Sequence, residues 1–216
     1  GDPHVRFYAG CPIKISGGHA VGTLCLVDRE PRSLSPKDRE LLQDLAAMAE
    51  DEIAAIQSAT IDHLTQMSNR RGFEVLGNHV LATCARLSLP ATLLFFDLDG
   101  FKQINDQHGH SEGDRALQRF AEAMSLTFRT SDVYARLGGD EFVVLLSNTS
   151  EPEIHAALER LQHAIDASNA NVVPGLHLRF SAGAVTSEAG SEDIAALLRK
   201  ADQRMYENKR LRRTAV

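Results

Sequence analysis

The stretch Val133-Tyr134-Ala135-Arg136-Leu137-Gly138-Gly139-Asp140-Glu141-Phe142-Val143-Val144 decides the fold of this chain. Apolar β-forming residues on both sides of a Gly-Gly pair are typical of a β-hairpin, because glycine adopts the positive φ angles that a tight turn needs. Two acidic residues, Asp140 and Glu141, follow the glycines directly. The sequence therefore predicts a hairpin that carries two carboxylates at its tip.

A second acidic pair ends the apolar run Thr92-Leu93-Leu94-Phe95-Phe96-Asp97-Leu98-Asp99. Side chains two residues apart in a strand project from the same face, so both carboxylates are expected together at the end of this strand. If the hairpin pairs beside it, the carboxylates of Asp97, Asp140 and Glu141 and the carbonyl of Leu98 converge. Such an oxygen-rich, incompletely filled shell suits Mg²⁺, whose other ligands are phosphates and waters.

Helices and strands are expected to alternate after residue 60. The expected elements are helices at 70–88, 112–128, 153–168 and 192–210, and strands at 91–97, 132–137, 141–147 and 177–185. This β-α-β-β-α-β order with extra helices is typical of the ferredoxin-like (palm-type) arrangement, an α+β fold in which helices flank an antiparallel sheet. Residues 60–216 are predicted to form one complete domain.

The segment 1–58 has a different pattern. Two short strands, at 5–15 and 20–27, are separated by a two-glycine turn, and a linker helix is expected at about 35–58 with Ser35 as its N-cap. Two strands do not fold alone. The apolar stripe of the helix is as compatible with burial against its own domain as with a two-stranded coiled coil.

Composition excludes several classes of protein. The net charge is −6, and no basic run occurs before 209–213, so a nucleic-acid partner is not expected. No run approaches the ~20 apolar residues that span a bilayer, and no membrane contact is expected in this segment. Three cysteines without a C-x-x-C pair predict reduced thiols in a cytoplasmic protein. The absence of a G-x-x-x-x-G-K-[ST] motif excludes a P-loop NTPase.

The hexapeptide Leu137-Gly138-Gly139-Asp140-Glu141-Phe142 resembles the signature of the GGDEF family of diguanylate cyclases. Other blocks similar to that family occur in the same order and spacing. They are Asp62-His63-Leu64-Thr65, Asn69-Arg70-Arg71, Phe96 to Asp106, Gly109-His110, Gly113-Asp114, Ser181-Ala182-Gly183, Ala201-Asp202, Met205-Tyr206 and Lys209. Residues 5–58 resemble the last half of a GAF domain, a small-molecule sensor, so the first half of that sensor is expected to be absent from the segment.

The resemblance implies that two GTP molecules, each held by one domain of a homodimer, condense to cyclic di-GMP and two pyrophosphates. It implies catalytic roles for Asp97, Asp140 and Glu141, with Asp97, the Leu98 carbonyl, Asp140 and Glu141 as ligands of Mg²⁺ or Mn²⁺. Glu141 either binds metal or helps to deprotonate the attacking 3′-hydroxyl. The two roles are not separated by the sequence.

Substrate contacts follow from the same resemblance. An acidic side chain accepts the N1–H and N2–H₂ donor pair of guanine, and Asp114 and Asn105 match the family positions that read this base. Asp114 therefore favours GTP. The remaining implied substrate-binding residues are Phe101, Lys102, Gly138, Gly139, Lys209 and Arg213.

Arg129 and Asp132 match the R-x-x-D site at which the family binds its product as an inhibitor. A guanidinium pairs with guanine O6 and N7, so cyclic di-GMP is expected to bind there. The main alternative function is a non-catalytic cyclic di-GMP or GTP receptor with the same fold. The intact acids of the hairpin argue against it, and also against a purely structural dimerisation unit.

Overall fold

The computed structural model describes the chain apart from a few short segments. The described residues are 4–15, 18–149, 151–173, 175–187 and 192–214. The chain divides into two compact units, Gly1–Ala59 and Thr60–Val216. In the part of the chain that the structure describes, every helix is too short or too polar to cross a membrane.

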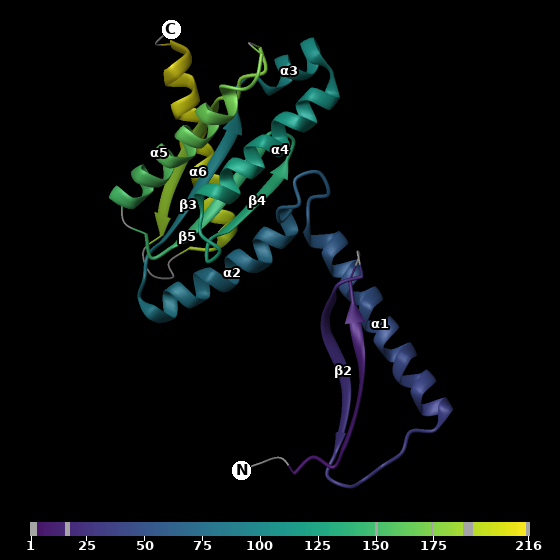
Figure 1. Cartoon of the computed structure of the whole chain (residues 1–216). Coiled ribbons are helices and arrows are strands. Elements are labelled where there is room, and N and C mark those ends of the chain that lie inside the picture. The colour runs from purple at the N-terminus through teal and green to yellow at the C-terminus, as the bar shows by residue number, and fades with distance from the viewer. Residues whose placement is uncertain (1–3, 16–17, 150, 174, 188–191, 215–216) are drawn as a thin grey trace. The chain divides into compact units, whose positions relative to one another are not determined.

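The larger unit is built on a four-stranded antiparallel sheet (Figure 1). Its strands are β3 (Ala91–Leu98), β4 (Val133–Gly138), β5 (Glu141–Ser147) and β6 (Phe180–Ser187). Their order is β4-β5-β3-β6, and β3 lies between β5 and β6. Because β3 is central, the acidic residues at its end lie beside both neighbouring strands. The predicted α+β, ferredoxin-like fold is confirmed.

Helices cover both faces of this sheet (Figure 1). They are α2 (Arg70–Leu87), α3 (Phe101–His108), α4 (His110–Thr127), α5 (Glu151–Asn169) and α6 (Ile194–Thr214). One core, with Phe96 and Phe120, lies between the sheet and α3, α4 and α5. The other core, with Phe95 and Leu197, lies between the sheet and α2 and α6. Since strand side chains alternate, Asp97 shares its face with Phe95, on the side of α2 and α6.

One short helix was not predicted, and one predicted strand boundary is wrong. The helix α3 was not predicted, because it is only eight residues long, buries only Ile104 and lies between Gly100 and Gly109, both at positive φ. The strand expected from residue 177 begins at Phe180 instead. The N–H of Leu178 donates to the Asn169 side chain at 2.7 Å, so this backbone is bonded to a helix end rather than to the sheet.

The smaller unit contains an antiparallel hairpin and one helix. The strands β1 (Phe7–Lys14) and β2 (Ala20–Asp28) pair with each other, and α1 runs over Pro36–Thr60. The predicted cap is confirmed: the N–H of Asp38 donates to Ser35 Oγ at 3.2 Å, and the N–H of Ser35 donates to Asp38 Oδ2 at 2.9 Å. Leu42 and Ala46 are the buried residues of α1.

Candidate active site

The end of β3 and the tip of the β4–β5 hairpin meet, as the sequence predicts. Asp97 and Glu141 are direct partners across the β3–β5 pair, so their side chains leave the same face of the sheet. The N–H of Leu98 donates to the carbonyl of Asp140 at 3.2 Å. Asp97, Leu98, Asp140 and Glu141 are therefore brought together, although they come from two segments more than forty residues apart.

The carboxylates of this cluster repel one another. Burial raises the pKa of Asp97, the negative charge of Asp140 raises it further, and the ammonium of Lys209 opposes both. Burial likewise raises the pKa of Glu141, while Arg70, whose Nη2 lies 3.7 Å from Glu141 Oε2, opposes it. Half-buried carboxylates with raised pKa values are stabilised by an added cation, because a cation favours their charged forms.

The donor chemistry of the cluster fits a hard divalent cation, which prefers carboxylate and carbonyl oxygens. Among the described residues, no group of three or more His, Cys, Asp or Glu side chains stands ready to hold a metal ion. Two features account for this. One predicted ligand, that of Leu98, is a backbone carbonyl, and the carboxylate of Asp97 is ion-paired with Lys209.

The Gly-Gly turn is held in place by an arginine that sequence reasoning did not assign to the site. Gly138 and Gly139 both have positive φ, at 146° and 51°. Arg136 donates from Nε and Nη2 to the carbonyl of Gly139, at 3.0 and 2.9 Å. Its Nη1 lies 3.2 Å from both carboxylate oxygens of Asp62. Asp62 is the first residue of the first sequence block that is similar to the family. Its place in that block is the sequence feature that could have indicated a role for Asp62 in the site.

The two residues predicted to read guanine lie close to each other at the α3–α4 junction. Asn105 on α3 is half-buried, and its amide lies against Gly113 of α4, where an added Cβ would be 2.0 Å from Asn105 Oδ1. Asp114 is the next residue along α4 and is exposed. Lys102, also exposed, follows Phe101 in the first turn of α3.

The predicted phosphate-binding cations are only partly placed. Lys209 comes from α6 and contacts Asp97 and Asp99 at the end of the sheet. The side chain of Arg213 lies outside the described residues. The structure therefore puts Lys209 beside the carboxylates, and the contact to phosphate stays a prediction for both residues.

Arg129 and Asp132 form a tight turn before β4. The N–H of Arg129 donates to Asp132 Oδ2 at 2.9 Å, and the N–H of Asp132 donates to the carbonyl of Arg129 at 3.0 Å. Burial raises the pKa of Asp132, while the positive charges of Arg129 and of Arg160 on α5 oppose it. Arg160 was not predicted, because it lies about thirty residues further along the chain.

Residues 59–215 match the family described as "Diguanylate cyclase, GGDEF domain". The chain belongs to this family. Residues 1–53 match the GAF domain family, so the GGDEF domain follows GAF-type sequence. The recognised signature, Leu137 to Phe142, is the tight hairpin tip described above.

Known GGDEF proteins extend the comparison. The chain is 32% identical over 168 residues to the protein named probable diguanylate cyclase DgcC of Escherichia coli K12, covering 78% of this chain and 45% of DgcC. It therefore spans less than half of that relative. The GGDEF domain of TpbB (YfiN) from Pseudomonas aeruginosa is 33% identical, with a TM-score of 0.64 and coverage of 70% of this chain and 89% of that one.

A further solved structure agrees in fold alone. The coiled coil and GGDEF domain of DgcB from Caulobacter crescentus, in complex with c-di-GMP, has a TM-score of 0.74 and 22% identity. The match covers 83% of this chain and 95% of that one.

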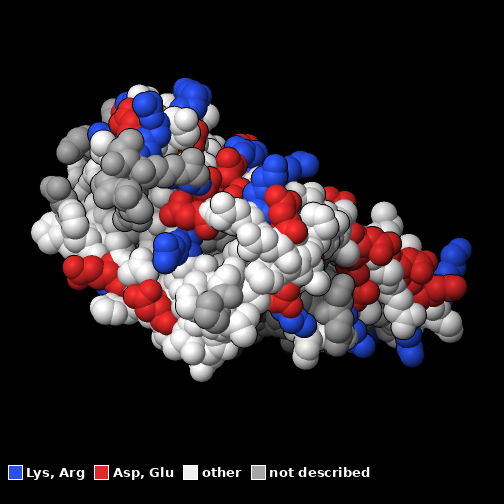
Figure 2. All heavy atoms as spheres, turned by 90° about the horizontal axis from the view of Figure 1, so that it is seen from above, with Lys and Arg blue, Asp and Glu red and all other residues white. Residues whose placement is uncertain are grey.

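Charges of both signs gather at the end of the GGDEF domain where β3 ends. Figure 2 looks onto this end, and acidic side chains lie beside basic ones there rather than within an area of one sign. A site that binds both a metal ion and a triphosphate needs this mixture, because carboxylates hold the metal and cations hold the phosphates.

Proposed function

We propose that this chain is a diguanylate cyclase that condenses two GTP molecules into cyclic di-GMP and two pyrophosphates. The observation that carries the proposal is the pairing of Asp97 with Glu141 across β3 and β5, with Asp140 at the turn and the ammonium of Lys209 beside them. Membership of the GGDEF family and the similarity to the probable diguanylate cyclase DgcC support it.

The proposed reaction is an in-line displacement that happens twice. The 3′-oxygen of one GTP forms a bond to the α-phosphorus of the other. The bond between that phosphorus and the oxygen that bridges the α- and β-phosphates breaks, and pyrophosphate leaves with the electron pair. The 3′-hydroxyl loses its proton during the attack. In one proposed role Glu141 accepts this proton, and its raised pKa, caused by burial, suits a proton acceptor. Binding a metal ion is the other role proposed for Glu141.

The nucleotide would be held from three sides. Asp114 would accept hydrogen bonds from guanine N1–H and N2–H₂, and Asn105 would bond to the same base, which gives selectivity for GTP. The exposed turn of Gly138 and Gly139 leaves room for the triphosphate, because nothing lies within 4 Å of a Cβ added at either glycine. Phe101, the first residue of α3, is a further proposed substrate contact. Lys102, Lys209 and Arg213 supply positive charge for the phosphates.

Diguanylate cyclases are metal-dependent, and the residues present fit Mg²⁺, with Mn²⁺ as the alternative. Asp97, the Leu98 carbonyl, Asp140 and Glu141 would hold it. When bound, a divalent cation neutralises phosphate charge and makes a coordinated oxygen easier to deprotonate. The protein's own contribution is to hold these oxygens on one strand end and one tight turn.

Condensation requires two GGDEF domains face to face, so a homodimer is part of the proposal. Cyclic di-GMP bound at Arg129 and Asp132 would inhibit turnover by keeping the two domains apart. The GAF-type segment would act as the sensor that controls the output of the GGDEF domain. The family match of residues 1–53 supports this arrangement.

The proposal is tested by incubating the protein with GTP and Mg²⁺ over a range of protein concentrations and separating the products by chromatography. Asp140→Asn is the inactive variant, and Glu159→Gln, on the exposed face of α5, is the matched control that also removes one negative charge. We expect cyclic di-GMP from the parent and from the control, with a rate per protein that rises with concentration. Asp140→Asn should make none.

Two results would contradict the cyclase. Intact GTP at every protein concentration, together with tight binding of cyclic di-GMP, would identify a receptor instead. Equal product from the parent and Asp140→Asn would show that the hairpin carboxylates are not the reacting site.

A further inference from the structure

Lys209 lies between two carboxylates at the end of the sheet. Its ammonium is paired with Asp97 and lies 3.6 Å from Oδ1 of Asp99. The three side chains are largely withdrawn from solvent, with exposed fractions of 16% for Lys209, 19% for Asp97 and 29% for Asp99. Asp97 is a proposed metal ligand and Asp99 is not. The ammonium thus has one partner that the metal also needs and one that the metal does not need.

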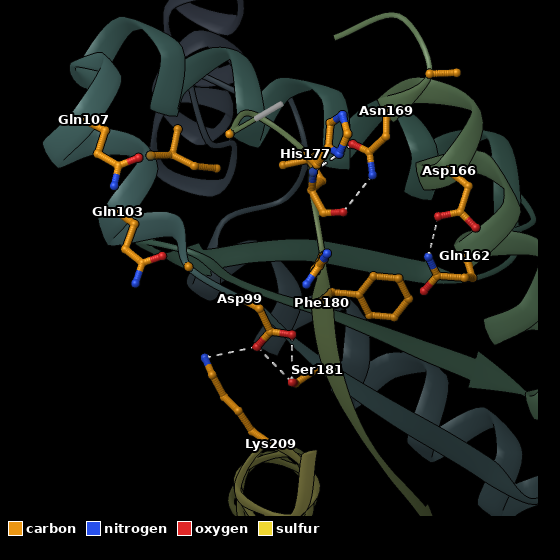
Figure 3. A pocket seen from close by; sticks show the side chains of 16 residues that line it. Asp99, Gln103, Gln107, Gln162, Asp166, Asn169, His177, Phe180, Ser181 and Lys209 are labelled. Atoms are coloured by element: carbon orange, nitrogen blue, oxygen red, sulfur yellow. Dashed lines mark hydrogen bonds and ion pairs between the residues drawn. The ribbon is translucent and has the colours of Figure 1, made fainter. Parts of the chain in front are cut away.

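Asp99 is fixed from two directions. The hydroxyl of Ser181 on β6 lies 2.9 and 3.1 Å from the two carboxylate oxygens of Asp99. The N–H of Asp99 donates to the carbonyl of Arg179 at 2.8 Å. Ser181 is 1% exposed and is the register partner of Asp97. Figure 3 shows Asp99 between Ser181 and Lys209 at one end of a pocket that α3, α5 and β6 line.

The helix that carries Lys209 is also held close to Ser181. At Gly183, two residues along β6, an added Cβ would lie 2.2 Å from both the carbonyl oxygen of Ala201 and the N of Met205. Only glycine permits this approach of α6 to the strand. Lys209 follows Met205 by one helical turn and so lies on the same side of α6. Ser181 and Gly183 thereby act on the same lysine, one through Asp99 and the other through the helix.

We propose that Asp99, fixed by Ser181, is a positioning residue for Lys209. It gives the ammonium a second carboxylate, so that Lys209 releases Asp97 to the metal ion and still points toward the phosphates. This inference rests on the proposed function, because the metal ion and the phosphates arrive with GTP. Without Asp99, the metal would have to displace the ammonium from its only carboxylate.

A plain charge effect is the competing explanation, because a carboxylate near the metal attracts a cation without any help from lysine. The two explanations differ in whether Lys209 is needed. If Asp99 acts through Lys209, removing both side chains should have no more effect on metal dependence than removing Lys209 alone. If Asp99 acts by its charge, the effect of losing it should persist in a chain that lacks Lys209.

The experiment measures the Mg²⁺ concentration for half-maximal binding of α,β-methylene-GTP, an analogue that cannot release pyrophosphate, by calorimetry. The same Mg²⁺ midpoint is measured for cyclic di-GMP synthesis from GTP. Asp99→Asn should raise both midpoints about tenfold, as expected for a hydrogen-bonded ion pair, while kcat at saturating Mg²⁺ changes less. Ser181→Ala, which alters no charge, should raise them by a smaller factor.

Two matched controls accompany these variants. Asp166→Asn removes an exposed carboxylate that lines the same pocket from α5. Thr92→Val removes a buried hydroxyl that pairs with Thr186 at 2.9 Å between β3 and β6. Both should leave the Mg²⁺ midpoint unchanged. In a Lys209→Ala background, Asp99→Asn should also leave it unchanged.

A tenfold shift that persists in Lys209→Ala would overturn the positioning role in favour of plain charge. An unchanged midpoint in Asp99→Asn that folds normally would overturn it outright, and an unchanged midpoint in Ser181→Ala would remove the part assigned to the serine. If Asp99→Asn does not fold, Ser181→Ala, alone and with Lys209→Ala, decides the question.

The binding measurement separates this inference from the cyclase itself. If the parent binds the analogue in a Mg²⁺-dependent way but makes no cyclic di-GMP, the proposed function fails and the variants still decide the role of Asp99. If the parent makes cyclic di-GMP and Asp99→Asn behaves like Asp166→Asn, the positioning role fails and the function stands. A parent that does not bind the analogue overturns both.

Discussion

Arg136 donates from one guanidinium nitrogen to both carboxylate oxygens of Asp62, at 3.2 Å each, across 74 residues of chain. The other two nitrogens of the same guanidinium donate to the carbonyl of Gly139. Asp62 is held in turn by the N–H and the hydroxyl of Thr65, at 2.9 and 2.7 Å. One side chain therefore links the first loop of the GGDEF domain to the turn that presents the proposed catalytic acids.

Arg136→Lys should impair turnover while the fold survives. Lysine keeps the charge but lacks the planar fork that reaches Asp62 and Gly139 together. Since a displacement of about 1 Å in an active site can cost ~100-fold in rate, we expect kcat to fall about 10- to 100-fold with a smaller change in KM for GTP. Steady-state synthesis of cyclic di-GMP measures both. Arg86→Lys, on the exposed end of α2, is the control, and a variant at position 136 with parental kcat would refute the link.

The same contact predicts how stability depends on pH. Burial alone would raise the pKa of Asp62, but the hydrogen bonds from Thr65 and the charge of Arg136 outweigh it, so the pKa lies below its ordinary value. A carboxyl whose folded pKa is depressed stabilises the fold above its unfolded pKa, near 3.9, and loses that contribution as pH falls through the folded value. The parent should therefore lose stability below about pH 4 more steeply than Asp62→Asn.

Urea unfolding at intervals from about pH 3 to pH 7 measures this difference. Above about pH 5 the parent should exceed Asp62→Asn by a constant amount of about 2 kcal/mol, the size of a hydrogen bond to a charged group. Below that pH the two curves should converge. Parallel curves over the whole range would show that Asp62 does not carry the acid sensitivity.

Gly113→Ala should weaken nucleotide binding by displacing Asn105. The new Cβ would lie 2.0 Å from Asn105 Oδ1, so the amide must move away from the position in which it is proposed to read the base. Losing hydrogen bonds to guanine should raise KM for GTP about tenfold, with a smaller effect on kcat. Gly77→Ala is the control, because its nearest atom is the flexible Cδ1 of Ile194 at 3.0 Å. An unchanged KM would mean that Asn105 does not contact the base.

The sequence predicted those parts of the site that depend on local pattern. Strand alternation and a Gly-Gly turn are enough to place Asp97 and Asp140 at the ends of their elements. The convergence of these residues required the hairpin to pair beside β3, which the β-α-β-β-α-β order favours. Antiparallel pairing of β3 with β5 then makes Asp97 and Glu141 partners.

The supporting contacts were not predictable in the same way. Arg136 meets Asp62 across 74 residues, and Ser181 meets Asp99 across 82. Such pairs depend on how distant elements align with each other, and the spacing of residues within one segment does not predict that alignment. The short helix α3 was missed for a different reason: it is only eight residues long and buries only Ile104, so it is shorter than the window over which apolar periodicity is recognised.

Arg160 is expected to take part in binding the inhibitory product at the proposed site of Arg129 and Asp132. The charge of Arg160 acts on Asp132 together with that of Arg129, although Arg160 comes from α5. If cyclic di-GMP binds at this turn, a second guanidinium adds another charged hydrogen-bond donor for the product. Arg160→Ala should therefore weaken inhibition by cyclic di-GMP at least about tenfold, the effect of one hydrogen bond to a charged group, and should leave the uninhibited rate unchanged.

Initial rates of pyrophosphate release at increasing concentrations of added cyclic di-GMP test this prediction. Arg129→Ala should weaken inhibition in the same way. Arg115→Ala, which removes an exposed arginine of α4 that pairs with Glu112 at 2.6 Å, should not. If cyclic di-GMP inhibits Arg160→Ala as strongly as the parent but inhibits Arg129→Ala less, the product site includes Arg129 and Asp132 and not Arg160. If cyclic di-GMP inhibits both variants as strongly as the parent, it does not act through this turn at all.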